Sequence, residues 1–162
     1  MDAGDLYRAH APAVLGYLRG QGVPEPEDLL SEVFLQVARS LPRYRGTESD
    51  LRRWVFAIAR NRVIDASRRR RARPPVARPD PPDRPAPENP GALDPDLLEA
   101  LGALTAEQRE VVVLRFVADL PLDDVAVLTK RSSGAVKSMQ HRALDQLARI
   151  LSDPSCAVEG DD

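Results

Sequence analysis

Nine prolines crowd into residues 73–95 and divide this chain of 162 residues into two parts. Proline donates no backbone hydrogen bond and disfavours helix at the residue before it. Because residues 73–91 have almost no aliphatic side chains, the segment buries too little surface to fold by itself. We therefore predict a flexible but semi-rigid Pro-rich linker over residues 73–94. The alternative interpretation is a PxxP ligand for a signalling domain.

Both flanking parts have apolar residues at the 3.6-residue period of amphipathic helices, and neither contains a candidate strand. Before the linker, the pattern predicts three helices and a polar loop over Pro42–Asp50. After it, the pattern predicts four helices, which begin near Pro95, at a capping box of Thr105 and Gln108, at Pro121 and near Ser133. The second of these four is expected to run through Val117. We expect an all-α chain of two small helical domains at residues 1–72 and 95–152, with an acidic, disordered tail at 153–162.

Charge is distributed unevenly although the whole chain has a formal net charge of only −2. Residues 1–72 carry 13 basic and 9 acidic side chains, whereas residues 96–162 carry 7 and 12. Nine arginines lie between Leu51 and Arg73, interrupted by the single acid Asp65. A helix with one apolar stripe and a basic remainder suits a polyanion, since each arginine can neutralise a phosphate.

Aromatic residues are interspersed with these arginines. Trp54 and Phe56 have flat faces that can stack on unpaired bases. Trp54 also lies on the apolar stripe of its helix, so packing in the core is an equally open interpretation. For the arginines, the alternative is a solvated helix face.

The segment around Thr129–Ser132 has the pattern of a helix-turn-helix, in which the second helix enters a DNA major groove. Either Ser132 or Ser133 is expected to cap that second helix. Its outward side chains follow from the helical period, opposite an apolar face that we expect to include Leu144 and Leu151: Lys137, Ser138, His141 and Arg142.

Acidic residues surround the apolar face of the helix that begins at Pro26: Glu25, Glu27, Asp28 and Glu32. One interpretation is favourable placement of acids at a helix N-terminus. The other is a docking face for a partner with basic residues.

Motifs of catalysis are missing from the sequence. It has no glycine-rich phosphate loop, no metal-ligand spacing and no GxSxG elbow. We predict no enzyme activity, no catalytic residue, no metal and no cofactor. His10 is expected at the edge of the core, and His141 has no obvious carboxylate partner.

Other sequence features bear on location. The longest apolar run, Trp54–Ala59, is far shorter than the roughly 18–20 residues of a membrane span. The first residues lack a basic start followed by an apolar core, so we expect no signal peptide. The single cysteine, Cys156, cannot form an internal disulfide, which favours a reducing cytoplasm.

Four segments together resemble the extracytoplasmic-function (group IV) sigma factors, the small two-domain class of bacterial initiation factor. In the first part these are EPEDLLSEVFLQVARSL at Glu25–Leu41 and LRRWVFAIARNRVIDASRRRR at Leu51–Arg71. In the second part they are ALTAEQREVVVLRFVADLPLDDVAVL at Ala103–Leu128 and GAVKSMQHRALDQL at Gly134–Leu147. The resemblance covers nearly everything except the linker and the last ten residues.

This resemblance implies three sets of contacts. The first domain, sigma region 2, would dock on the clamp helices of the largest subunit of RNA polymerase core through Asp28, Leu29, Glu32, Val33 and Phe34. It would also read and melt the −10 element, and the loop before the arginine helix would hold a flipped base. The residues implied for these contacts are Arg43, Tyr44, Arg45, Arg52, Arg53, Trp54, Arg60 and Asn61. The second domain, sigma region 4, would bind the polymerase flap and read the −35 element through Lys130, Arg131, Ser133, Lys137, Ser138, His141 and Arg142.

The resemblance also implies further partners. The linker would thread through polymerase near the RNA exit path, and an anti-sigma protein is a possible inhibitor.

The sequence departs from the family pattern in the helix-turn-helix. The turn holds Lys130 and Arg131 instead of a glycine and an apolar residue, and Ala135 and Met139 replace a usual threonine and arginine. These changes predict −35 binding that depends more on backbone charge than on base readout. Two other functions stay open on the residues alone: a stand-alone helix-turn-helix regulator of duplex DNA, and a helical adaptor that binds only proteins.

Overall fold

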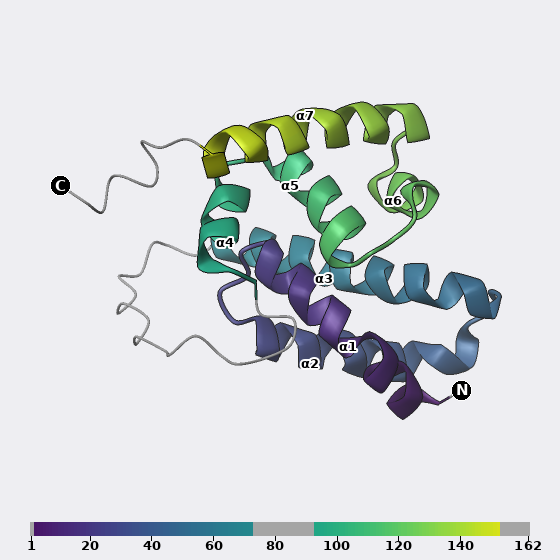
Figure 1. The fold of residues 1–162 in the computed structure, drawn as a ribbon. Coiled ribbons are helices and arrows are strands. Elements are labelled where there is room, and N and C mark those ends of the chain that lie inside the picture. The colour runs from purple at the N-terminus through teal and green to yellow at the C-terminus, as the bar shows by residue number, and fades with distance from the viewer. Residues whose placement is uncertain (1, 73–92, 153–162) are drawn as a thin grey trace. The chain divides into compact units, whose positions relative to one another are not determined.

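The computed structural model describes residues 2–72 and 93–152, and every regular element in these two ranges is helical (Figure 1). The prediction of an all-α chain is confirmed. The predicted linker, apart from its last two residues, and the predicted tail lie outside the described residues. None of the described helices is long and apolar enough to cross a membrane.

Contacts divide the described residues into two compact units. The first comprises residues 2–18 and 25–72, and the second comprises residues 19–24 and 93–152. The domain limits at residues 72 and 95 stay predictions.

The first unit is built from three helices: α1 (Ala3–Gly20), whose last two residues belong to the second unit, α2 (Pro26–Ser40) and α3 (Leu51–Ala72). Two short 3-10 turns, η1 (Leu41–Arg43) and η2 (Glu48–Asp50), lie within the polar loop between α2 and α3. Helices α2 and α3 pack against each other. Helix α1 joins them through two edge-to-face aromatic pairs, Tyr7 with Phe34 at 5.0 Å and Tyr17 with Phe56 at 5.8 Å between ring centroids. Such pairs add specificity to the area that the rings bury.

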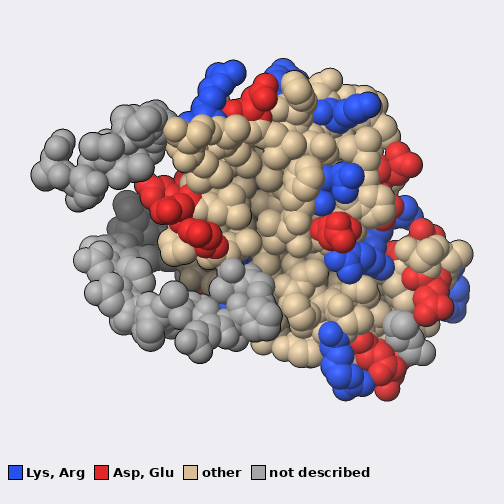
Figure 2. Space-filling view, in the orientation of Figure 1, with Lys and Arg blue, Asp and Glu red and all other residues tan. Residues whose placement is uncertain are grey.

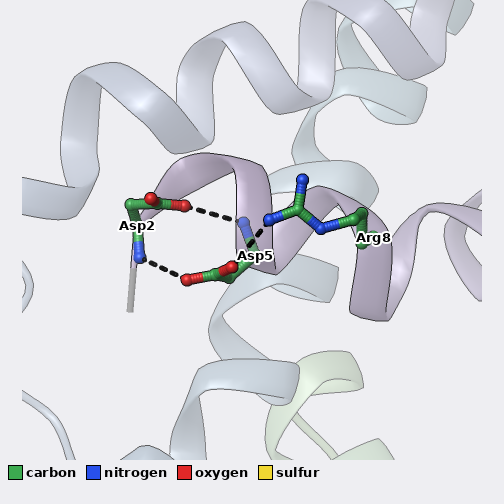
Figure 3. Close-up of polar contacts among 3 residues, drawn as sticks. All are labelled: Asp2, Asp5 and Arg8. Atoms are coloured by element: carbon green, nitrogen blue, oxygen red, sulfur yellow. Dashed lines mark hydrogen bonds and ion pairs between the residues drawn. The ribbon is translucent and has the colours of Figure 1, made fainter.

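Helix α1 begins at a reciprocal pair of aspartates (Figure 3). The Asp5 backbone N–H donates to an Asp2 carboxylate oxygen at 2.8 Å, and the Asp2 N–H donates to Asp5 at 3.2 Å. Arg8 forms an ion pair with Asp5 at 2.7 Å. The backbone N–H of Asp2, which forms that bond to the Asp5 carboxylate, and the Arg8 guanidinium hold the pKa of Asp5 below its usual value. These contacts satisfy donors that a helix N-terminus leaves without intrahelical partners.

The second unit contains α4 (Pro95–Gly102), α5 (Ala106–Val112), α6 (Leu122–Thr129) and α7 (Ser133–Ser152). The predicted capping box at the start of α5 is confirmed, because Thr105 accepts from the Gln108 N–H and Gln108 accepts from the Thr105 N–H. Helix α7 packs against α4, α5 and α6, and its buried side chains are Val136, Ala143 and Leu147. The expectation that Leu144 and Leu151 share this inner face is wrong, since they are 39% and 52% exposed.

A π-helical turn, η3 (Val113–Val117), follows α5 where the sequence predicts a continuing α-helix. The Ala118 N–H reaches back five residues to the Val113 carbonyl at 2.9 Å, and the backbone then turns through Asp119 at a φ of 57°. Arg115 donates to the Leu120 carbonyl at 3.2 Å, across that turn. The wider turn keeps Val113 and Leu114 buried, so the apolar pattern alone does not reveal it.

Candidate nucleic-acid and partner interfaces

The arginines of α3 lie on different sides of the helix. Residues advance by about 100° each along an α-helix, so Arg53, Arg60 and Asn61 share one side. The opposite side holds Leu51, Val55 and Ala59, which are buried. Arg53 and Arg60 are half-buried and Asn61 is exposed. Three of the predicted −10 residues therefore lie together on the outward side of α3.

Arg52 lies on the packed side of α3, apart from those three residues. Its guanidinium carbon is 5.7 Å from the centre of the Phe56 ring, in a cation–π arrangement. Burial lowers the pKa of His10, on α1, and the Arg52 charge lowers it further. The position expected for His10, at the edge of the core, agrees with its half-buried side chain. Arg52 therefore packs on a core ring of its own helix, and its charge acts on His10 of α1.

The loop between α2 and α3 is held by side chains. The Tyr44 ring packs on Trp54, with centroids 4.9 Å apart and planes tilted by 46°, and its hydroxyl donates to the Thr47 carbonyl at 2.6 Å. The Thr47 hydroxyl donates to Asp50 at 2.9 Å, and Asp50 pairs with Arg53 at 3.4 Å. These contacts connect the loop to the first turns of α3. Trp54 is half-buried and packs on Tyr44 of the loop instead of within the core, and its stacking on unpaired bases stays a prediction.

Two more predicted −10 residues belong to this loop. Arg45 is exposed, and its guanidinium donates to the carbonyls of Pro42 and Tyr44 at 3.3 and 3.2 Å. Arg43 is exposed at the end of η1. The loop therefore presents two cations beside a tyrosine–tryptophan pair, which suits the backbone and the bases of an unpaired strand.

The last turns of α3 are strongly basic. Residues 68–71 are four exposed arginines, and the last turn of a helix is where cations are favoured by the helix dipole. Arg62, six residues before Arg68, donates to the Gln36 side chain on α2 at 2.8 Å. The exposed arginines place four positive charges at this end of α3, whereas Arg62 joins two helices.

The predicted polymerase-docking residues of α2 divide into two groups. Leu29, Val33 and Phe34 are at most 8% exposed, and they form part of the unit's own core. Asp28 and Glu32 are exposed. Leu35, which the sequence-based set omitted, is 53% exposed on the same helix. Leu35 directly follows the buried Val33 and Phe34, and this position on the helix is the signal that could have identified it as an exposed apolar residue.

The turn between α6 and α7 contains a lysine in an unusual backbone conformation. Lys130 ends α6 at a φ of 57° and a ψ of 43°, which is the left-handed region that glycine adopts most easily. Lys130 and Arg131 are both exposed. The Ser132 hydroxyl accepts from the Ala135 N–H at 3.1 Å, so Ser132 is the residue that caps α7.

Helix α7 presents the four outward side chains that the sequence predicts, since Lys137, Ser138, His141 and Arg142 are all exposed. The statement that His141 has no obvious carboxylate partner is wrong, because Asp145, one turn later, lies 3.7 Å from its Nε2.

Ser133, the remaining predicted −35 residue, donates to Asp123 of α6 at 3.0 Å and so connects the two helices. Figure 2 shows that both basic and acidic side chains are exposed on the face drawn. Nowhere in residues 2–72 and 93–152 do three potential metal ligands gather.

Comparisons with known proteins address each unit separately. Residues 6–73 match the family Sigma-70 region 2, and residues 95–147 match Sigma-70, region 4. The chain is 35% identical to the RNA polymerase sigma factor CarQ of Myxococcus xanthus over 92% of this chain and 88% of that protein. It is 33% identical to the ECF RNA polymerase sigma factor BldN of Streptomyces coelicolor over 93% of this chain and 60% of BldN.

Among solved structures, the sigma factor RpoE of Bartonella quintana, in complex with the anti-sigma factor NepR, matches with a TM-score of 0.73. The match covers 93% of this chain and 96% of RpoE at 22% identity, a likeness that concerns the fold. CnrH, in complex with the cytosolic domain of CnrY, matches with a TM-score of 0.67 at 21% identity, over 99% of this chain and 89% of CnrH. The two family matches together cover most of the sequence, in the order region 2 then region 4. The chain therefore belongs to the sigma-70 family of RNA polymerase sigma factors, in its extracytoplasmic-function group.

Proposed function

We propose that this chain is an alternative sigma factor that joins RNA polymerase core, reads −35 and −10 promoter elements and helps to melt the DNA. The observation that carries the proposal is the pairing of two surfaces with different chemistry on one chain. The first unit has an aromatic pair beside arginines, which suits an unpaired strand. The second has a helix-turn-helix, which suits duplex DNA. A stand-alone regulator of duplex DNA needs only the second surface.

The −35 element would be read by α7. The outward side chains Lys137, Ser138, His141 and Arg142 are the base-facing candidates, and the exposed Lys130 and Arg131 would contact phosphates. Ser133 would act indirectly, because its hydroxyl bond to Asp123 holds α7 against α6.

The −10 element would be opened by the loop and α3 of the first unit. Arg43, Arg45, Arg53 and Arg60 would follow the strand's phosphates, and the loop would take an unpaired base. Arg52 is left out of this set because it packs against Phe56. Replacing Arg45 and Arg53 by alanine is expected to reduce open complexes more than polymerase binding. Permanganate reactivity of the melted bases measures the first and a pull-down measures the second.

Polymerase core would dock at the exposed rim of α2, formed by Asp28 and Glu32, with the buried Leu29, Val33 and Phe34 supporting that rim from within. The chain itself would do no covalent chemistry, since polymerase supplies it, and it would work in the cytoplasm beside the genome. Two relatives of the same fold were solved with the anti-sigma factor NepR and with the cytosolic domain of CnrY. An anti-sigma partner is part of the proposal on that ground.

The decisive experiment is transcription in vitro from a promoter library, using purified polymerase core with and without the chain. We expect transcripts that require the chain and that share two sequence elements. Binding of the chain to duplex DNA with no transcript from any template would contradict the proposal. That outcome would favour the stand-alone regulator.

A further inference from the structure

Tyr44 lies directly over Gly46 in the loop that precedes α3. A β-carbon built on Gly46 would be 2.6 Å from Cζ and 2.9 Å from Cε2 of the Tyr44 ring. Both distances are below any that real β-carbons adopt. Gly46 is not among the residues with positive φ, so its backbone conformation is open to other residues. A side chain at this position is therefore accommodated only if the Tyr44 ring moves.

The same ring has two further contacts that fix its position. One face packs on Trp54 of α3, and the hydroxyl donates to the Thr47 carbonyl. Burial raises the pKa of Tyr44, and the nearby Asp50 carboxylate raises it further. A tyrosine hydroxyl is protonated at neutral pH in any case, and these shifts act in the same direction, so it remains a donor.

We propose that these contacts form a clasp, in which the Tyr44 ring covers Gly46 and its hydroxyl bonds to Thr47, that holds the loop ready for an unpaired base. Tyr44 is thus a positioning residue for promoter opening. This inference rests on the proposed function, because it assigns a device to the same loop. The physical advantage is that the loop loses its conformational entropy on folding and not on binding the strand.

Two substitutions separate the parts of the clasp. Tyr44→Phe keeps the ring over Gly46 and on Trp54 but removes the bond to Thr47. Gly46→Ala keeps every atom of Tyr44 but forces its ring to move. Tyr7→Phe, on the exposed tyrosine of α1, and Gly102→Ala, where an added β-carbon meets nothing within 4 Å, are the matched controls.

Trp54 is the only tryptophan in the chain and lies against the Tyr44 ring, so its emission reports on the clasp. In the free full-length chain, Gly46→Ala is expected to shift that emission to longer wavelength, and Tyr44→Phe to shift it less. Circular dichroism checks that both variants fold.

Strand binding is measured with the chain assembled on polymerase core. The probe is a fluorescein-labelled single strand that carries the −10 element of a promoter selected from the transcription library. We expect Tyr44→Phe to weaken binding about 2- to 10-fold, the effect of one lost hydrogen bond, and Gly46→Ala to weaken it more. Binding of −35 duplex and of polymerase core should not change in either variant, and neither control should differ from the parent.

Three other results would contradict either the clasp or the proposed function. If the parent binds the strand and both clasp variants bind it equally well, the clasp does not position the loop, whatever the Trp54 emission does. If strand binding falls without any change in emission in Gly46→Ala, the ring is not displaced and the clasp is again wrong. If the parent complex itself does not bind the strand, the proposed function fails and the clasp loses its role with it.

Discussion

The left-handed conformation of Lys130 makes a prediction in which stability and DNA binding change in opposite directions. Lys130→Gly removes a β-carbon from a backbone at φ 57° and ψ 43°, at the end of α6. That conformation costs a residue with a β-carbon about 1–2 kcal/mol. Glycine also lowers the free energy of unfolding by about 0.4–1 kcal/mol, because it has more conformational freedom in the unfolded chain. The expected net gain in the free energy of unfolding is therefore about 0.5–1 kcal/mol.

Hydrogen exchange of the most protected amides of α7 measures this gain in the full-length chain. The exchange rates should fall about 2- to 5-fold in Lys130→Gly. Lys130→Ala is the matched control, since it removes the same charge but keeps the β-carbon, and its exchange rates should change little. Equal rates in the two variants would refute the argument from backbone strain.

DNA binding should respond to the charge alone. Both variants lose one cation beside the duplex, so the slope of log affinity against log salt should become shallower by about 0.9 in each. An unchanged slope in both variants would mean that Lys130 contacts no phosphate. Because the two readouts depend on different atoms, either half of the prediction can fail without the other.

Three further predictions concern other surfaces. Asp28→Arg with Glu32→Arg should abolish the recovery of polymerase core in a pull-down and leave the circular dichroism spectrum unchanged, because both side chains are exposed; undiminished recovery would remove the docking assignment. Arg142→Ala should change which −35 bases a binding selection prefers, and a uniform loss over all sequences would make it a phosphate contact instead. The lowered pKa of His10 means that the folded chain binds fewer protons than the unfolded chain, so the free energy of unfolding should fall as pH drops below about 6.5. Urea midpoints from tryptophan fluorescence at several pH values test this, and His10→Gln should flatten the dependence.

Much of the fold could be predicted from local patterns. The helical period identified every long helix, because each one buries a stripe against its neighbours. The capping box at Thr105 was also predictable, since it depends only on two side chains three residues apart. The side of each helix that faces the core was partly predictable too. In α7 the outward side chains lie opposite Val136 and Leu147, which are buried.

Contacts that depend on tertiary placement could not be predicted. The helical period brings Arg52 beside Phe56 four residues later, but only the packing of α3 decides that Phe56 is buried and that Arg52 therefore lies on a core ring. Lys130 adopts a left-handed backbone conformation that a residue with a β-carbon disfavours, so its residue type does not indicate this conformation. The contact of Tyr44 with Gly46 is invisible to periodicity, since both residues lie in a loop.

The π turn at Val113–Val117 also gives this chain a site where its length can change. A π turn holds one residue more than the α turn it replaces, and π-bulges behave as single-residue insertions in a helix. Deleting one residue there would restore α-helical geometry, and the side chains on either side of the turn would keep their directions. The same deletion within α7 would rotate every later side chain by about 100° and turn Leu147 away from the core. In alignments of relatives, one-residue gaps should therefore gather at this turn and be rare in α7.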